Sequence, residues 1–468
     1  MHSRILSQVS VAIILLSVLS LPFAQQTPPA PLSINPLKIK KLEIYGIKKT
    51  KKEVIKTLFG LDTGAQYDSL LVANGEIKLE RTNLFSKVDV LTLKKADGVD
   101  LYIIVEEKFY LVPYDVGGQY FLQKYGKEEF WWRLRLGMEF SNFRGRMETL
   151  RASFIFWDWR SLALSWQKPL LSTPYYFTIG ASVDYYPDEI DWSDNTTIVG
   201  RFIAGRKVAS RSRVALGLVP IYRNELHSSG IQQTDKPLII EKDTLNNYEL
   251  FSTLGWSSDF RKSTFDPSGG WYLYTDLKSN VLYSGKYNPY FQFSSDLRLY
   301  HHGIFKDNKI ACRIATVFRN TDGGPLNNLQ YGGEGTIRGY LHRQFGQQFE
   351  VNNSFLLSME YRFPIYEFPP IELPFLAAYN KALASLQYRI DGAVIFDYGR
   401  FSKEFKDLFA LDAKKMESGI GIGLGLRVML PLFEKSVCAD LVWGENPYTE
   451  TFDFYRKPIF HVYLDMFY

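Results

Sequence analysis

From about Leu111 to Tyr468, apolar and polar residues alternate one for one in stretch after stretch. The clearest stretches are 132–140, 177–185, 420–430 and 460–468. A period of two residues predicts strands that have one apolar and one polar face. Sixteen such stretches can be read from the sequence. Each is close to the ~9–11 residues that a tilted strand needs to cross a bilayer.

Alternation alone fits either a soluble sheet, whose apolar face packs on a second layer, or a membrane barrel, whose apolar face meets lipid. Gaps after even-numbered stretches are mostly short, such as 142–147, and gaps after odd-numbered ones tend to be longer, such as 223–245 and 321–351. Only 366–385 is long where a short turn is expected. Short turns opposite long loops are typical of outer-membrane barrels. We therefore predict a 16-stranded antiparallel transmembrane β-barrel over residues 108–468.

A small unit at residues 37–107 precedes the barrel. Thr50 followed by Glu53 resembles a capping box at the start of one helix, and Asp68 can cap a second. The apolar residues expected on the second helix are Leu70, Ala73 and Ile77. The pair Asp97-Gly98 lies between two strand-like stretches and predicts a hairpin. The order is that of one small β-α-α-β-β domain.

The first residues predict a secretory signal peptide over 1–24. Arg4 supplies the positive charge and Val9–Leu21 an apolar run of suitable length. The alternative is an N-terminal membrane anchor, but the run is short for crossing a bilayer. Residues 25–36 are rich in proline and predict a linker.

Composition agrees with a barrel and argues against other classes of protein. Aromatic residues reach 16%, with 30 Tyr and 34 Phe, while charged residues stay at 22%; barrels need aromatics for two interfacial girdles. The net charge of +5 is spread along the chain, which does not indicate nucleic-acid binding. Cys312 and Cys438 are far apart and the six His are scattered, so neither a metal site nor a cofactor is expected.

The segment 332–340 contains four glycines and lies between the eleventh and twelfth predicted strands. By itself it could be an ordinary flexible loop. Alternation in the next two strands turns Glu360 and Asp397 toward the lumen, and these two carboxylates offer a planar docking point for Arg338. The alternative is that these charges only line a solvated wall.

These segments resemble motifs of the BamA/TamA family, the outer-membrane assembly factors also called the bacterial surface antigen family. Ile337-Arg338-Gly339-Tyr340 resembles the family's Val-Arg-Gly-Phe loop motif. Phe396-Asp397-Tyr398-Gly399 resembles its Phe-x-Asp-x-Gly strand motif, with the Phe one place closer to the Asp. Glu360–Pro364 and Phe265–Pro267 resemble further segments of such barrels. The unit at 37–107 resembles a polypeptide-transport-associated (POTRA) domain.

The resemblance implies that Arg338 is held inside the lumen by Glu360 and Asp397. It implies a protein of the cell outer membrane that assembles or translocates outer-membrane proteins, with the POTRA domain in the periplasm. Expected partners are unfolded outer-membrane protein clients, periplasmic accessory proteins and outer-membrane lipid, and we expect a monomeric barrel. A client would add a strand to the periplasmic sheet and then to the barrel seam, where Pro113 and Gly117-Gly118 weaken the first strand.

Three other functions are weighed against this one. A two-partner-secretion pore would export one protein through the lumen, but such pores usually have two periplasmic domains and a plugging helix. A diffusion porin has no use for the N-terminal domain. An enzyme is not expected, because the sequence has no Gly-x-Ser-x-Gly elbow and no catalytic His setting.

The last strand is predicted to be the signal for the protein's own assembly. Its lipid-facing residues are Phe460, Val462, Leu464, Met466 and Tyr468. Deleting Tyr468 removes an aromatic anchor at the membrane interface, so less folded protein should reach the outer membrane. The measurement is the amount of heat-modifiable monomer on unboiled gels; an undiminished amount would contradict the prediction.

Overall fold

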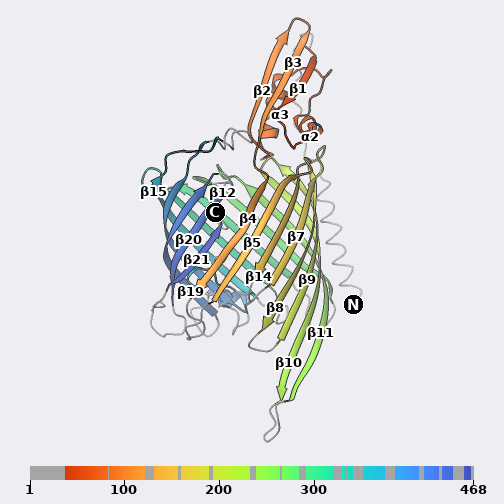
Figure 1. Ribbon diagram of the computed structural model, residues 1–468. Helices are drawn as coiled ribbons and strands as arrows, with labels where there is room; N and C mark the ends of the chain where they lie inside the picture. Colours follow the sequence, from red (N-terminus) through yellow and green to blue (C-terminus); the bar gives the residue numbers. More distant parts are fainter. Residues whose placement is uncertain are drawn as a thin grey trace. The chain divides into compact units, whose positions relative to one another are not determined.

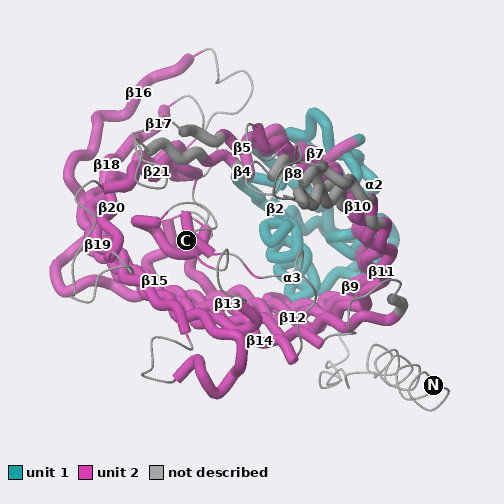
Figure 2. The backbone as a smooth tube through the Cα atoms, turned by 90° about the horizontal axis from the view of Figure 1, so that it is seen from below, with its two compact units in different colours: residues 1–108, 144–147, 170–175 teal, residues 109–143, 148–169, 176–468 magenta. Residues whose placement is uncertain are grey.

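The computed structural model describes residues 37–82, 84–121, 131–156, 160–188, 193–231, 239–263, 266–283, 291–320, 329, 331–333, 335–340, 345, 351–374, 385–409, 416–431, 435–445 and 458–464. The expected signal peptide and linker, and also Met466 and Tyr468, lie outside the described residues. The chain forms two compact units. One holds residues 1–108 with 144–147 and 170–175, and the other holds the remainder (Figure 2).

The first unit has the predicted β-α-α-β-β order. Its sheet has the strand order β1-β3-β2, with β1 parallel and β2 antiparallel to β3. The elements are β1 (Ile39–Tyr45), α2 (Lys52–Phe59), α3 (Ser69–Glu80), β2 (Phe85–Lys95) and β3 (Gly98–Glu107). Alternate residues of β3 form the core together with the apolar face of α2. They are Val99, Leu101, Ile103 and Val105, each at most 1% exposed.

The helix starts agree with the sequence only in part. Asp68 caps α3 as predicted, because its carboxylate accepts the Leu70 amide at 2.8 Å. The capping box at Thr50 is wrong: the N-cap of α2 is Lys51, whose side chain makes no capping hydrogen bond. The Thr50 amide instead donates to the buried carboxylate of Glu107 at 2.7 Å. A tertiary acceptor at the end of β3 therefore holds this turn.

The face that α3 buries also differs from the expected one. Leu70 and Ile77 are 63% and 39% exposed, and the buried positions are Val72, Gly75 and Leu79. The reason lies at Gly75, where an added Cβ would come within 2.6 Å of the Phe59 ring of α2. Close approach to α2 at this glycine sets the rotation of α3, and it outweighs the number of apolar residues on the other face.

The second unit is a closed barrel of sixteen strands, as the sequence predicts (Figures 1 and 2). Neighbouring strands run antiparallel, and the last strand, β21, closes on the first, β4. The strands are β4 (Leu111–Phe121), β5 (Trp131–Phe143), β6 (Glu148–Phe156), β7 (Arg160–Pro169), β8 (Tyr175–Asp188), β9 (Ser193–Ala209), β10 (Ser212–Ile231), β11 (Ile239–Asp259), β12 (Gly270–Tyr283), β13 (Phe291–His302), β14 (Lys309–Arg319), β15 (Asn353–Glu367), β18 (Arg389–Ser402), β19 (Met416–Leu430), β20 (Lys435–Gly444) and β21 (Ile459–Leu464).

The alternation places apolar side chains outside and polar ones in the lumen. Outward residues such as Leu164, Phe202 and Leu424 are 50–60% exposed, as expected of a lipid-facing surface. Cys312 lies on the outward face of β14, and Cys438 is buried on the inward face of β20; both are free. Of the helices in the described ranges, none has the length and apolar character to cross a membrane.

The connection between β15 and β18 is the long one noted in the sequence. It carries the two-stranded pair β16 (Ile371–Glu372) and β17 (Ser385–Leu386), and residues 375–384 lie outside the described ranges. A 3-10 helix, η3 (Phe405–Phe409), follows β18. Within the part of the chain that the structure describes, no group of His, Cys, Asp and Glu could hold a metal ion.

Within the ranges that the structure describes, four residue pairs join β21 to β4, from Phe460–Tyr120 to Tyr463–Gly117. Residues 465–468, which follow the last of these pairs, lie outside the described ranges. Among the described residues, ten pairs join β4 to β5 and six join β20 to β21. Gly117 and Gly118 both lie within the four seam pairs, so glycine occupies half of the β4 side of this ladder.

Candidate functional site

The loop between β14 and β15 turns into the lumen at its glycines. Gly332, Gly333 and Gly339 have φ angles of +131°, +92° and +86°, a region that side-chain-bearing residues rarely adopt. The Gly333 amide donates to the Ile337 carbonyl at 3.0 Å, and the Gly332 amide donates to the Thr336 hydroxyl at 2.8 Å. This compact turn presents Arg338 to the wall of the barrel.

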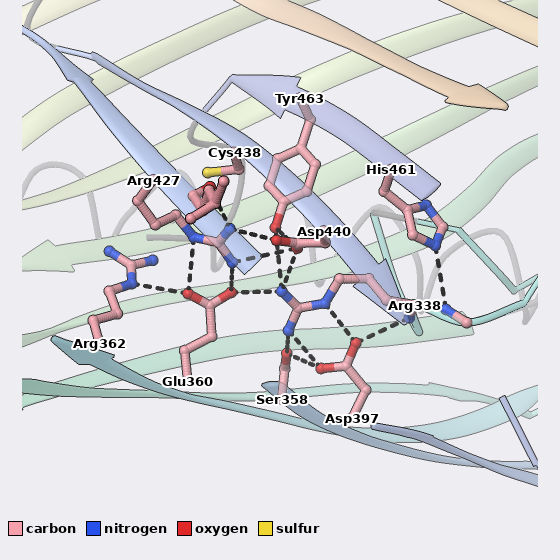
Figure 3. Close-up of polar contacts among 12 residues, drawn as sticks. Arg338, Ser358, Glu360, Arg362, Asp397, Arg427, Cys438, Asp440, His461 and Tyr463 are labelled. Atoms are coloured by element: carbon pink, nitrogen blue, oxygen red, sulfur yellow. Dashed lines mark hydrogen bonds and ion pairs between the residues drawn. The ribbon is translucent and has the colours of Figure 1, made fainter. Parts of the chain in front are cut away.

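Arg338 makes its strongest contacts with Asp397 of β18 (Figure 3). Its Nε and one terminal nitrogen donate to the two carboxylate oxygens, each at 2.7 Å, and its backbone amide donates to Asp397 at 2.9 Å. The second terminal nitrogen donates to Glu360 of β15 at 2.5 Å and to Asp440 of β20 at 3.0 Å. Ser358 accepts a further hydrogen bond at 3.0 Å. The planar guanidinium thus bridges three strands.

Two further arginines complete the cluster and share its carboxylates. Arg427 of β19 donates to Glu360 at 2.7 Å and also bonds Asp440, and Arg362 donates to Glu360 at 2.8 Å (Figure 3). Three guanidinium groups therefore face three carboxylates, and the cluster is electrically balanced. All six side chains are at most 4% exposed.

Because this cluster is buried, its ion pairs are not weakened by water as they would be in an open lumen. Charges removed from water need compensation by partners of opposite sign and by hydrogen bonds. In this cluster the compensation comes from residues that are distant in sequence, because Arg338 is 22 residues from Glu360 and 102 from Asp440. Removing any one charge would leave its partners buried and unbalanced.

The other side of the loop packs into a small apolar core inside the barrel. Ile337 and Tyr340 are fully buried against residues of the loop and of strands β14, β15 and β18. The members of this core are Ala315, Tyr331, Ile337, Tyr340, Phe345, Val351, Leu356 and Phe401. The Phe345 ring packs at a tilt against Tyr340 and Phe401, with ring centroids 4.7 Å and 4.8 Å apart. Apolar packing thus holds one side of the loop and ion pairs hold the other.

Glycines in the wall make room for the loop. An added Cβ at Gly421 of β19 would lie 2.2 Å from the Arg338 carbonyl oxygen, and one at Gly444 would lie 2.3 Å from that of Gly339. At Gly425 an added Cβ would lie 2.2 Å from the Asp440 carboxylate. The polar face of β19 is mostly glycine because loop backbone and ionic cluster occupy the space that its side chains would fill.

The loop also binds the closing strand. A terminal nitrogen of Arg338 donates to the Tyr463 hydroxyl at 3.2 Å, and that hydroxyl donates to Asp440 at 2.6 Å. The Gly339 amide donates to Nε2 of His461 at 3.2 Å (Figure 3). Since Nε2 accepts this bond, the imidazole must carry its proton on Nδ1 when neutral.

The structure brings Arg338, Glu360 and Asp397 together, with Gly339 at the wall and Ile337 and Tyr340 in the apolar core. Sequence reasoning missed the other members of the cluster, which are Ser358, Arg362, Arg427, Asp440, His461 and Tyr463 as a group. The hydrophobic alternation assigns most of them to the lumen, and this is the signal that the sequence offers for them. Their spacing along the chain does not indicate which of them contact one another.

The proposed terminal signal has only its first part in the described residues. Phe460 and Val462 are outward, at 41% and 37% exposed. Leu464 departs from the expected series, because it is only 6% exposed. Leu464 nevertheless pairs with Val437 of β20 in the same register that pairs Val462 with Ala439, so it keeps its place in the alternation and differs only in its burial.

Comparison with known proteins identifies the family to which this barrel and its N-terminal domain belong. A family described as the Omp85 superfamily domain matches residues 142–454. The chain belongs to the Omp85 superfamily. A second family, the POTRA domain described as a surface antigen variable number repeat, matches residues 37–108. Membership makes the chain an outer-membrane protein without enzymatic activity.

Solved structures share the fold at low sequence identity. BamA from Haemophilus ducreyi lacking POTRA domains 1–3 is 15% identical with a TM-score of 0.60, over 91% of this chain and 84% of that one. CdiB from Escherichia coli is 14% identical (TM-score 0.59, covering 92% and 76%), and CdiB from Acinetobacter baumannii is 12% identical (0.56, 92% and 74%). No curated protein matches the sequence.

The first prediction from the site concerns Arg338→Ala. It leaves Asp397 buried without its main cation, which should cost about 3–5 kcal/mol of loop docking. The barrel should stay folded and heat-modifiable, while the loop becomes accessible to protease. Arg338→Ala combined with Asp397→Ala should restore part of the lost protection, because it removes the unpaired charge. Equal protease cleavage in wild type and the single variant would contradict the pairing.

The second prediction concerns Gly421→Ala. Alanine is normally no worse than glycine in a strand, yet here its Cβ would displace the Arg338 backbone. We expect the loop to become as exposed to protease as in Arg338→Ala. The matched control is Gly335→Ala in the loop itself, where an added Cβ meets nothing within 4 Å. If the loop is equally resistant to protease in both variants, the space between β19 and the loop backbone does not govern docking.

Proposed function

We propose that this protein inserts other β-barrel proteins into the outer membrane, receiving unfolded clients through its POTRA domain in the periplasm and templating them at the barrel seam. Superfamily membership supports a role in assembly or translocation. The observation that carries the finer proposal is the composition of the β21–β4 ladder, in which glycine occupies two of the four β4 positions that the described residues show. No covalent chemistry is required, because client folding and the burial of its apolar face in lipid supply the free energy.

The seam is suited to opening because its first strand is irregular. Backbone groups in lipid must be paired, so a barrel ordinarily has no free edge. In β4 the pairing with β5 is interrupted by a register shift between Pro113 and Asp115, and glycine follows at 117 and 118. Proline lacks the N–H donor and glycine weakens strand packing. Opening this ladder would expose an edge for a client strand.

The buried cluster supports the same proposal from inside the barrel. Arg338 and Gly339 bond Tyr463 and His461 of β21, and Asp440 of the neighbouring β20 joins the same network. These contacts tie β21 to β15, β18 and β20, whereas its described contact with β4 is the glycine-containing ladder. Strain on the barrel would therefore separate β21 from β4 before it separated β21 from β20.

The POTRA sheet offers a second edge for a client. β2 pairs with β3 on one side, and within the described residues no strand pairs with its other side. Leu91 and Leu93 on β2 are 53% and 52% exposed. An extended apolar segment could add to this edge through main-chain hydrogen bonds, with side chains covering these leucines.

The alternative is a protein-translocating pore of the two-partner-secretion type, in which the client crosses the lumen. The charged residues exposed on the inner face of β9 and β10 favour an open path along that wall. The two functions differ in whether the seam must open.

The prediction is that a disulfide across the seam stops insertion. Gly118 and Val462 face each other, and such Cα atoms lie ~4.5–5.5 Å apart, within disulfide range. The variant Gly118→Cys with Val462→Cys is made with Cys312→Ser and Cys438→Ala. Oxidation should abolish folding of an unfolded outer-membrane barrel added to proteoliposomes, measured as its heat-modifiable form, and reduction should restore it.

The matched control uses the same cysteine on the other side of β21. Ala439 of β20 also faces Val462, so Ala439→Cys with Val462→Cys locks a ladder that need not open. This control should remain active in both redox states, and both proteins should stay heat-modifiable. Client folding by the oxidised seam variant at the control's rate would overturn the seam proposal and favour passage through the lumen.

A further inference from the structure

The lumen has two walls of different character. On β15, β18, β19 and β20 the charged lumenal side chains of the Arg338 cluster are almost completely buried. On β9 and β10, Arg201, Lys207 and Arg213 point to the same lumen by register, yet they are exposed. An inward-facing side chain can be exposed only if solvent reaches it, so this wall borders water.

The three cations on this wall have no ion pair among the described residues. Lys207 and Arg213 face each other directly across β9 and β10, and Arg201 lies further along β9 on the same face. Elsewhere in the lumen the cations are paired: Arg223 bonds Glu249 at 2.9 Å, and Arg261 bonds Asp259 at 2.8 Å. A pair of like charges directly opposite each other is unfavourable in a sheet unless an anion balances it.

Hydroxyl donors extend the wall. Along one row of directly paired residues, Arg213 is followed by Ser257 and then Tyr274. The Tyr176 ring of β8 lies over Gly205, where an added Cβ would be 2.2 Å from the ring. In the described part of the chain neither tyrosine hydroxyl forms a hydrogen bond. These O–H groups can donate to an anion beside the two cations.

The carboxylates near this wall do not neutralise it. Asp296, next to Tyr274 in the row, is held by Arg298 at 2.9 Å and by Arg313 at 3.1 Å. Asp184 on the inner face of β8 has Ser182 as its hydrogen-bond partner, at 3.4 Å. The row of directly paired residues thus carries two cations, Lys207 and Arg213, and one carboxylate, Asp296, which is already bound. Asp259 lies near Arg213 but is bound by Arg261 at 2.8 Å, and Asp276 on the same face has Lys278 as its ion-pair partner at 3.7 Å.

The ring order sets this wall apart from the loop. Around the barrel, β9 and β10 are the sixth and seventh strands counted from β4, and the strands that hold the Arg338 cluster are the twelfth to the sixteenth. The cationic wall and the loop seat are therefore on opposite sides of the ring. Within the described residues, the contacts of the loop extend as far as β14, where Ala315 packs against it and Arg313 donates to the Gly335 carbonyl at 3.2 Å.

We propose that the cationic wall of β9 and β10, with Lys207 and Arg213 at its centre, binds small inorganic anions and makes the barrel an anion-selective pore. Charged rings or walls of Lys and Arg favour anions in water-filled pores, and a low-dielectric barrel concentrates their field. This activity goes beyond protein assembly and does not depend on the seam.

The test is ion selectivity in planar bilayers. Under a KCl gradient, the full-length protein should show a reversal potential that corresponds to a chloride-to-potassium permeability ratio of at least about 2. Because the Debye length falls from ~10 Å at ~0.1 M to ~3 Å at ~1 M salt, the ratio should approach one at the higher concentration. Lys207→Gln with Arg213→Gln should bring the ratio near one at low salt.

The control removes two charges from the outer face of the barrel. Arg160 and Lys168 of β7 alternate with lumenal residues and face outward, so Arg160→Gln with Lys168→Gln should keep the wild-type ratio. A wild type that prefers potassium, shows no preference, or does not conduct would overturn the proposal. So would a selectivity that survives in Lys207→Gln with Arg213→Gln. Client assembly, measured in the same proteoliposomes, reports separately on the seam.

Discussion

The buried guanidinium of Arg338 is the interaction on which the rest of the barrel's interior depends. It is almost completely buried, and its charge is balanced by Asp397, Glu360 and Asp440. Those carboxylates belong to three different strands, and two more arginines balance them in turn. The loop, the wall glycines and the closing strand are all arranged around this one group.

Placing a loop inside a barrel has a geometric consequence for the wall. The inner face of β19, and the last residue of β20, Gly444, have glycine where other strands have side chains, because the loop backbone passes within contact distance of the sheet. Such glycine-rich strands would be weak by themselves. Here the loop supplies the packing that they lack, through the apolar core of Tyr331, Tyr340, Phe345 and Phe401.

The same arrangement gives the two sides of the barrel different physical properties. One side is dry, cross-linked and tied to β21, and it leaves the glycine-containing β21–β4 ladder as the weakest joint that the described residues show. The other side is wet and bears uncompensated cations. A seam that opens toward lipid and a wall that faces water can therefore coexist in one barrel, since they involve different strands.

Local pattern was enough for the architecture. The period of two along the chain determined sixteen strands and their inward and outward faces, and it assigned Glu360 and Asp397 to the lumen, because the side chain of each strand residue depends only on its own position in the pleat. Motif resemblance then singled out Arg338. The Asp97-Gly98 hairpin and the Asp68 cap were also predictable, because each involves neighbours in the chain.

The tertiary structure determined which residues come together and which of them are buried. The Thr50 capping box was wrong because Glu107, 57 residues away, captures the Thr50 amide, and α3 turned another face inward because Phe59 approaches Gly75. Arg427, Asp440 and Tyr463 joined the cluster through the closure of the barrel, which brings the last strands beside the loop. The meaning of the glycines in β19 appears only with the loop in place. Alternation reports which side of a sheet a residue occupies, but contacts across the lumen depend on the order and closure of all sixteen strands.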